Sequence, residues 1–184
     1  MKNILLLTTI FLSVSLAFVS CKKADNTSGT NGNYYVKFKF DGIAKTLTSA
    51  HGGITNGEGG VYGAAIYGKF SNDGAKESNI LILDSLPMNT TKTYRCILVK
   101  ANGTNDVPQA LFTYYDEHNA RYVATYLGYI TGPHPDQQIN VKFSEITKTY
   151  MKGSFDANIE LYGEKQPYVL HPITDGEFYI KRDY

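Results

Sequence analysis

The sequence has no tryptophan, only two cysteines and almost no net charge. Its 18 basic residues are balanced by 17 acidic ones, and no basic excess is clustered that would predict a nucleic-acid partner. The lack of tryptophan counts only mildly against a carbohydrate-binding module. Long apolar runs are also scarce: Ile4–Phe18 is shorter than the roughly 20 residues that a membrane-spanning helix requires.

That apolar run has the layout of a secretory signal peptide. It lies at the N-terminus, and Lys2 is the only charged residue before Cys21. A positively charged start followed by a short apolar segment is typical of a signal sequence that is removed from the mature protein. We therefore expect residues 1–20 to be cleaved away.

The end of this segment resembles a bacterial lipobox. Phe18-Val19-Ser20-Cys21 places a bulky apolar residue three positions before the cysteine and a small residue directly before it, although the common pattern has leucine in place of Phe18. Ordinary cleavage after Ser15-Leu16-Ala17 is the alternative. The resemblance implies that Cys21 is acylated on its thiol and on its new amine. Several acyl chains would anchor the domain stably to a membrane.

The cysteine count and the following residues extend this prediction. If Cys21 carries lipid, Cys96 has no disulfide partner, and its strand-like surroundings predict a small buried thiol. Lys22–Asn33 is rich in Asn, Ser, Thr and Gly and lacks apolar periodicity, which is typical of a flexible tether. We expect the lipidated cysteine and tether in residues 21–33 and a single domain in residues 34–184.

From Tyr34 onward the apolar residues recur with a period of two. In Tyr34–Phe40, for example, the aromatic residues and Val36 share one face and the lysines occupy the other. Similar runs are separated by turn signals every 8–12 residues, which predicts an all-β domain, an antiparallel β-sandwich or barrel of about nine or ten strands. The expected turns and loops are Asp41-Gly42, His51–Gly60, Asn72–Gly74, Asp116–Asn119 and Thr174–Gly176.

Three stretches carry a second resemblance: YVKFKFDGIAKTL, LILDSLPMNTTKTY, and ITKTYMKGSFDANIEL together with ITDGEFYIKR. They are similar to segments of small, uncharacterised lipoproteins from Bacteroidota-type bacteria. The resemblance implies an all-β envelope lipoprotein on the outer membrane, facing either the periplasm or the cell surface. It implies no catalytic residues, because the group has no established activity.

Residues that could carry chemistry are scattered. The four histidines are isolated in sequence, and none has a partner at metal-ligand spacing: His51, His118, His134 and His171. Asp116–Asn119 reads either as an acid/base pair or cation site or, more simply, as a polar hairpin tip. The same choice applies to His134–Asp136. We assign no catalytic, metal-binding or cofactor-binding residue from the sequence, and no cofactor.

Tyrosine is abundant, with 15 residues. Five of them gather in one predicted hairpin: Tyr114, Tyr115, Tyr122, Tyr126 and Tyr129. Such rings suit half-buried strands and also recognition surfaces. The sequence favours a non-catalytic envelope lipoprotein that binds a glycan, a peptide or a protein. The alternatives are a hydrolase that uses the loop carboxylates of Asp116, Glu117 and Asp136, and a structural or assembly component of the envelope.

Overall fold

The computed structural model describes residues 34–56, 61–101, 105–125, 137–164 and 167–183. These residues belong to one compact unit. The predicted signal peptide, the lipobox with Cys21 and the predicted tether lie outside the described residues. Within the described ranges, no helix combines the length and the hydropathy needed to span a membrane.

The described residues form twelve strands. In chain order they are β1 (Tyr35–Phe40), β2 (Ile43–Asn56), β3 (Tyr62–Lys69), β4 (Ser78–Asp84), β5 (Thr93–Arg95), β6 (Leu98–Ala101), β7 (Asn105–Pro108), β8 (Ala110–Tyr115), β9 (Arg121–Ala124), β10 (Gln138–Ile146), β11 (Tyr150–Leu161) and β12 (Leu170–Arg182). Ten strands belong to one sheet, and β6 and β7 pair separately. The predicted all-β, antiparallel class is confirmed.

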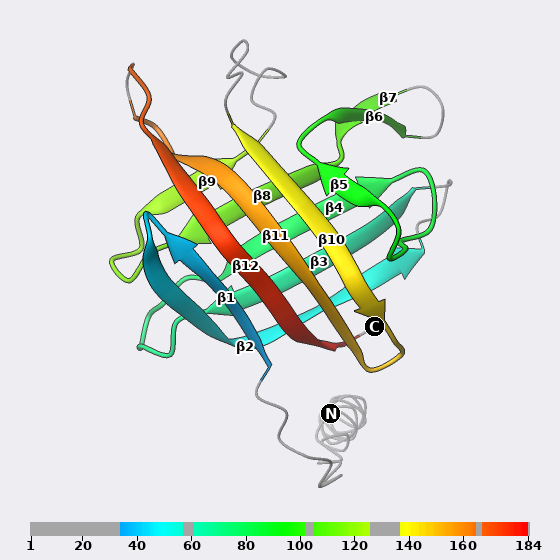
Figure 1. Cartoon of the computed structure of the whole chain (residues 1–184), viewed down its shortest axis with the longest axis horizontal. Coiled ribbons are helices and arrows are strands. Elements are labelled where there is room, and N and C mark those ends of the chain that lie inside the picture. The colour runs from blue at the N-terminus through cyan, green and yellow to red at the C-terminus, as the bar shows by residue number, and fades with distance from the viewer. Residues whose placement is uncertain (1–33, 57–60, 102–104, 126–136, 165–166, 184) are drawn as a thin grey trace, which may run out of the picture. The chain divides into compact units, whose positions relative to one another are not determined.

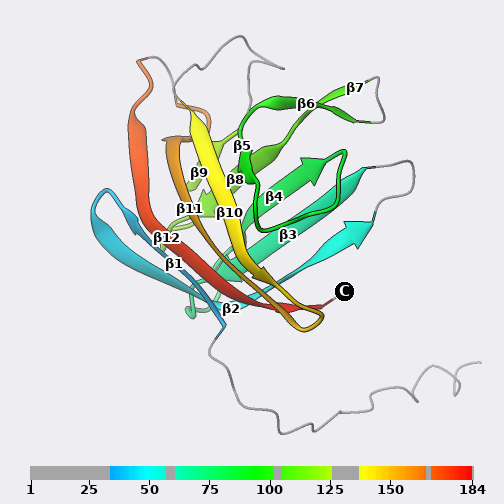
Figure 2. The same cartoon turned by 45° about the vertical axis from the view of Figure 1, so that its right-hand side comes forward.

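The main sheet closes on itself into a barrel of eight strands, in the order β1-β2-β3-β4-β8-β9-β11-β12 and back to β1 (Figures 1 and 2). Strand β10 pairs with β11 outside this ring, and β5 pairs with β10. Pairing is antiparallel except where the end of β12 runs parallel to β2 beside His51 and Gly52. Closure removes most of the free sheet edges that would otherwise invite aggregation.

The period-two pattern explains the core. Strand β10 shows it most clearly, because Ile139, Val141 and Phe143 are fully buried while Lys142 is exposed. Alternate residues of a strand point to opposite faces, so each strand contributes one apolar row to the interior. The largest fully buried side chains are Tyr94, Tyr114, Phe112, Phe143, Phe178, Leu47, Ile66, Ile80, Ile82, Ile139, Met151 and Ile159.

The turn between β1 and β2 confirms the prediction made from Asp41-Gly42. Both residues have positive φ, 50° for Asp41 and 78° for Gly42. A type I′ hairpin turn needs positive φ at both central positions, and Asp-Gly satisfies that need at low cost. The turn therefore places the end of β1 directly beside the start of β2.

Two turn predictions are wrong. Residues 51–56 of the expected His51–Gly60 loop belong to β2, because they pair with β3 from His51 opposite Tyr67 to Asn56 opposite Tyr62. Thr174–Gly176 lies within β12, where one extra residue forms a β-bulge against both β1 and β11. Asp175 has a φ of 52°, so its turn-like chemistry serves to kink a strand rather than to reverse the chain.

Candidate functional site

The two cysteines have separate outcomes. Cys21, the predicted lipidation site, lies outside the described residues, so its role stays a prediction. Cys96 is a free cysteine that packs against the hydrophobic core. Burial raises the pKa of the Cys96 thiol from 9.0 to about 11. Because the thiolate is the reactive form, this cysteine has the properties of a structural residue and not of a nucleophile.

The predicted polar hairpin tip is confirmed between β8 and β9. The Asp116 carboxylate accepts hydrogen bonds from the backbone N–H groups of His118 (2.9 Å) and Ala120 (2.8 Å). Glu117 forms an ion pair with Lys45 of β2 at 2.6 Å, and this hydrogen bond lowers the pKa of the Glu117 carboxyl. Two of the three carboxylates considered for a hydrolase, Asp116 and Glu117, are therefore engaged in holding the hairpin tip, and the third, Asp136, lies outside the described residues.

The histidines occupy different places. The His51 ring stacks on Tyr67 with 5.2 Å between centroids, whereas the side chain of His118 is almost fully exposed. His134 and the rest of the His134–Asp136 stretch lie outside the described residues. His171, at the start of β12, lies beside Asp41 in the β1–β2 turn, with 2.7 Å between Nδ1 and Oδ2.

His171 belongs to a cluster that we call the hairpin-end cluster: Phe40, Asp41, Tyr114, Tyr122 and His171. Phe40 and Asp41 come from the end of β1 and the turn after it. Tyr114 lies in β8, Tyr122 in the neighbouring strand β9, and His171 at the start of β12. The turns that join β1 to β2, β3 to β4 and β8 to β9 lie at this end of the barrel, on the left of Figure 1. The turn after β8 is tied to the β3–β4 turn because the Lys76 N–H donates to Asn119 Oδ1 at 2.9 Å.

The His171 ring is held on three sides. It stacks on Phe40 with 5.3 Å between centroids and 21° between planes. Tyr122 meets it edge-on at 5.2 Å and 81°, and Asp41 binds Nδ1. In the neutral ring, donation of Nδ1–H to the Asp41 carboxylate leaves on Nε2 the lone pair that a ligand donor requires. The arrangement therefore presents an oriented acceptor among aromatic rings.

Tyr114 supplies a second unused polar group to the cluster. The residue is fully buried, and its hydroxyl has no hydrogen-bond partner among the residues that the structure describes. Burial raises the pKa of Tyr114, and the negative charges of Glu117 and Asp116 raise it further. Burial also raises the pKa of Tyr122, assisted by the charge of Asp116. Because buried hydroxyls normally have partners, the Tyr114 hydroxyl indicates an unfilled contact.

Sequence reasoning found part of this cluster. It grouped Tyr114 and Tyr122, whose rings lie 5.9 Å apart, but the adjacent Tyr115 lies beside Lys76 instead. Tyr126 and Tyr129 lie outside the described residues. The pairing of Asp41 with His171 was missed because 130 positions separate them and each resembled an ordinary turn or strand residue.

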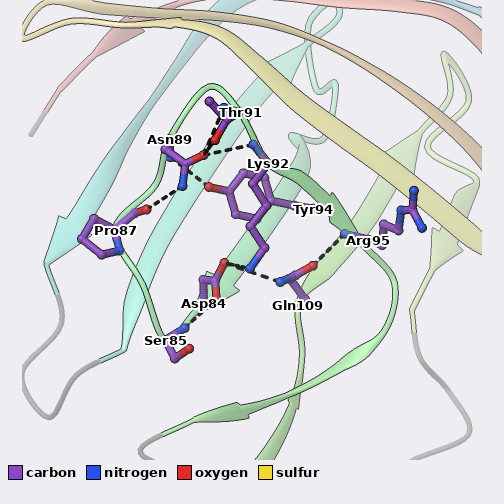
Figure 3. A network of polar contacts seen from close by, with 9 residues as sticks. All are labelled: Asp84, Ser85, Pro87, Asn89, Thr91, Lys92, Tyr94, Arg95 and Gln109. Carbon is purple, nitrogen blue, oxygen red and sulfur yellow. Dashed lines mark hydrogen bonds and ion pairs between the residues drawn. The ribbon is translucent and has the colours of Figure 1, made fainter.

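A second polar network closes the opposite side of the barrel (Figure 3). The buried Asp84 carboxylate forms an ion pair with Lys92 and accepts a hydrogen bond from Gln109 Nε2 at 3.5 Å. The Tyr94 hydroxyl accepts from the Asn89 N–H at 2.9 Å. Apart from Gln109, the residues named here belong to the stretch LILDSLPMNTTKTY. The polar residues of that stretch therefore fasten a loop to the barrel.

A shallow groove of about 210 Å³ lies on the outer face of β2, β3, β4 and β8. Its lining includes Gly53, Gly63, Ala65, Leu81 and Leu111. The lining offers almost no polar group that could orient a ligand. Ligand sites normally combine apolar surface with a few placed polar groups, so the hairpin-end cluster is the better candidate.

Together these features define an all-β barrel domain with an aromatic and polar cluster at one end. Within the described ranges, no group of three or more His, Cys, Asp or Glu side chains could hold a metal ion. No known family model, no curated protein and no solved structure matches the chain.

Proposed function

We propose that this chain is a lipid-anchored protein of the cell envelope, held on the outer membrane by acylated Cys21, whose barrel binds a ligand without transforming it. The anchor is supported by the signal-peptide layout and by the lipobox-like Phe18–Cys21 stretch. Binding without catalysis is supported by the engaged state of Asp116 and Glu117.

The hairpin-end cluster is the proposed binding site, and one observation carries this assignment. The cluster combines a buried Tyr114 hydroxyl, which has no hydrogen-bond partner within the described ranges, with a His171 ring that Asp41 and Phe40 hold in place. Aromatic faces pack against apolar surface, and oriented donors and acceptors recognise hydroxyl groups. A glycan offers both kinds of surface and is the ligand class that fits best, ahead of a peptide or a protein.

Ligand screening with matched variants tests the site. A glycan array followed by calorimetry should find a ligand whose affinity falls at least tenfold in Tyr122→Ala and in His171→Ala. Tyr115→Ala is the matched control, because Tyr115 occupies the same hairpin but contacts Lys76. Equal affinity in all three variants, or a screen with no glycan bound, would refute the assignment.

The anchor is tested separately with Cys21→Ser. The wild-type chain should fractionate with membranes and carry acyl mass on Cys21, and the variant should be soluble and lack that mass. A free thiol at Cys21 in the wild-type protein would show that the lipobox resemblance is misleading.

A second candidate function is hydrolysis, and the His171–Asp41 pair favours it. A histidine whose Nδ1 is held by a carboxylate is oriented as a general base. Turnover in a broad substrate screen that is lost in His171→Ala and in Asp41→Asn would support it. Unchanged turnover in these variants and in Asp116→Ala and Glu117→Ala would exclude these groups from catalysis.

A further inference from the structure

Four tyrosines converge on the face of the barrel where β1 begins. Tyr179 of β12 lies at their centre, with ring centroids 4.9 Å from Tyr34, 6.3 Å from Tyr35 and 5.4 Å from Tyr150. All four are half-buried, so each ring is partly open to the surroundings. We call these four residues, with Lys37 and Lys152, the tyrosine surface. None of them belongs to the hairpin-end cluster.

Both lysines lie over the rings. Lys37 Nζ is 3.8 Å from the centroid of Tyr35, and Lys152 Nζ is 4.9 Å and 5.0 Å from the centroids of Tyr150 and Tyr179. Lys152 also forms an ion pair with Glu145 at 3.2 Å. Aromatic rings capped by extended lysines form an amphipathic layer, with apolar ring faces and charged tips.

The surroundings of this surface are more basic than acidic. The β10–β11 turn contributes the exposed Lys148, and the end of β12 contributes Lys181 and Arg182, whose Nη1 donates to Thr147 O at 2.8 Å. With Lys37 and Lys152, these make five basic side chains. Among the described residues, three acidic side chains form ion pairs with them: Glu145, Glu177 and Asp183. A basic excess of this kind attracts anionic lipid headgroups.

The chain enters the domain at this surface. Tyr34 is the first residue that the structure describes, and its ring contacts Tyr179. Twelve residues lie between it and Cys21, so the two are 13 residue steps apart along the chain. A chain of that length reaches at most about 45 Å, which allows the domain to settle on the membrane that holds the anchor. The start of β1, the end of β12 and the β10–β11 turn lie along the same lower edge in Figures 1 and 2.

We propose that the tyrosine surface lies against the phospholipid headgroups of the membrane that carries the acylated Cys21. This inference rests on the proposed lipid anchor. Tyrosine and lysine are suited to the boundary between headgroups and water, because each has an apolar body and a polar tip. Contact with lipid fixes the orientation of the barrel, which a flexible tether alone would leave free.

The orientation has a consequence for the ligand site. Strand β1 runs from Tyr35 at the tyrosine surface to Phe40 in the hairpin-end cluster. A strand advances about 3.3 Å per residue, so roughly 17 Å separate the two ends. The hairpin-end cluster therefore stands away from the lipid and is accessible from the aqueous side.

The absence of tryptophan makes this orientation directly measurable. In the full-length acylated chain, Tyr35→Trp introduces a single indole at the tyrosine surface, and Tyr162→Trp introduces one at a largely exposed position in the turn after β11. Each variant is incorporated into vesicles of phosphatidylethanolamine and phosphatidylglycerol (3:1) that contain brominated lipid. We expect quenching of Tyr35→Trp emission to exceed that of Tyr162→Trp at least threefold. Adding Lys148→Glu and Lys181→Glu should reduce the excess.

Each outcome has a separate meaning. Protein that floats with the vesicles but shows equal or no quenching at the two positions overturns the proposed surface while leaving the anchor intact. Such a result would indicate that the tyrosine surface contacts a protein partner and not lipid. A chain that neither floats nor carries acyl mass on Cys21 overturns the anchor and the surface together.

Discussion

Two fully buried tyrosines differ in how their hydroxyls are used. The Tyr94 hydroxyl accepts a hydrogen bond from the Asn89 N–H, and the Tyr114 hydroxyl has no partner in the part of the chain that the structure describes. Tyr94→Phe should therefore cost about 1 kcal/mol of unfolding free energy. Tyr114→Phe removes a buried unsatisfied group and should be neutral or stabilising by about 1 kcal/mol. Urea denaturation of both variants measures the difference, and equal losses would contradict it.

The Tyr114 result also bears on the site. If the unpartnered hydroxyl is kept for a ligand, the variant that gains stability should lose affinity for that ligand. Exchange of stability against function is common where binding sites hold unsatisfied groups. Tyr94→Phe should leave the affinity unchanged.

The Cys96 thiol should make the free energy of unfolding depend on pH in the alkaline range. Its pKa is raised from 9.0 to about 11 in the folded state, because burial disfavours the thiolate. The stabilising contribution is fully present below pH 9 and is lost as the pH rises toward 11. Urea unfolding of wild type and Cys96→Ala at pH 8, 9.5 and 10.5 checks this. The variant should lose less stability over that range, and parallel losses would argue against the shift.

For single residues, the sequence predicts local properties better than it predicts which distant residues come into contact. The inert character of Cys96 and the turn at Asp41-Gly42 follow from local composition. The contact between Asp41 and His171 depends on the pairing of β1 with β12, which no local pattern encodes.

At the scale of elements, the bulge in β12 is a close contact between strands. A Cβ atom on Gly176 would lie 2.3 Å from Phe155 O of β11, whereas one on Gly42 meets nothing within 4 Å. Gly176→Ala should cost about 3 kcal/mol. Gly42→Ala should cost about 1 kcal/mol, because only its positive φ is strained. Thermal unfolding of the two variants should reproduce this order.

The strand pattern was predictable where one face is buried, as in β10 and β1. It failed at Thr174–Gly176, because the positive φ that Asp41 and Gly42 both adopt in a turn is adopted by Asp175 alone in a bulge. It also failed at residues 51–56, where His51-Gly52-Gly53 resembles a loop. A Cβ on Gly52 would meet Ala65 O at 2.0 Å, so this glycine is present because of a close strand contact.

The loop after β4 depends on a buried charge. Lys92→Met leaves the Asp84 carboxylate buried without its ion-pair partner, which should cost about 3 kcal/mol. Lys45→Met is the matched control, because its partner Glu117 is partly exposed and can be solvated; it should cost less than about 1 kcal/mol. Chemical denaturation measures the loss of unfolding free energy in both variants. Similar losses would show that the Asp84–Lys92 pair is effectively solvated.

At the scale of the whole molecule, the barrel has a weak junction between β9 and β11, where the paired segment is short. Within the described residues, β9 joins β11 where Val123 lies opposite Glu160 and Tyr122 opposite Leu161, with one further bond from the Tyr162 N–H to Arg121 O, whereas β11 pairs with β12 along most of its length. Local opening follows the weakest pairing. Amide hydrogen exchange should be at least tenfold faster in β9 than in the part of β11 bonded to β12. Uniform protection would mean that the barrel opens only as one unit.

The pairing of β1 with β12 also sets the timing of folding. Because Tyr35 lies opposite Tyr179, the first strand waits for nearly the whole chain to be synthesised before its ladder is complete. At about 5–20 residues per second, this wait lasts on the order of 10 s. Such non-local closure folds slowly, since loop entropy is lost before the contacts form. A chain exported by the predicted signal peptide would thus stay unfolded, and able to pass through a secretion channel, until its last strand is made.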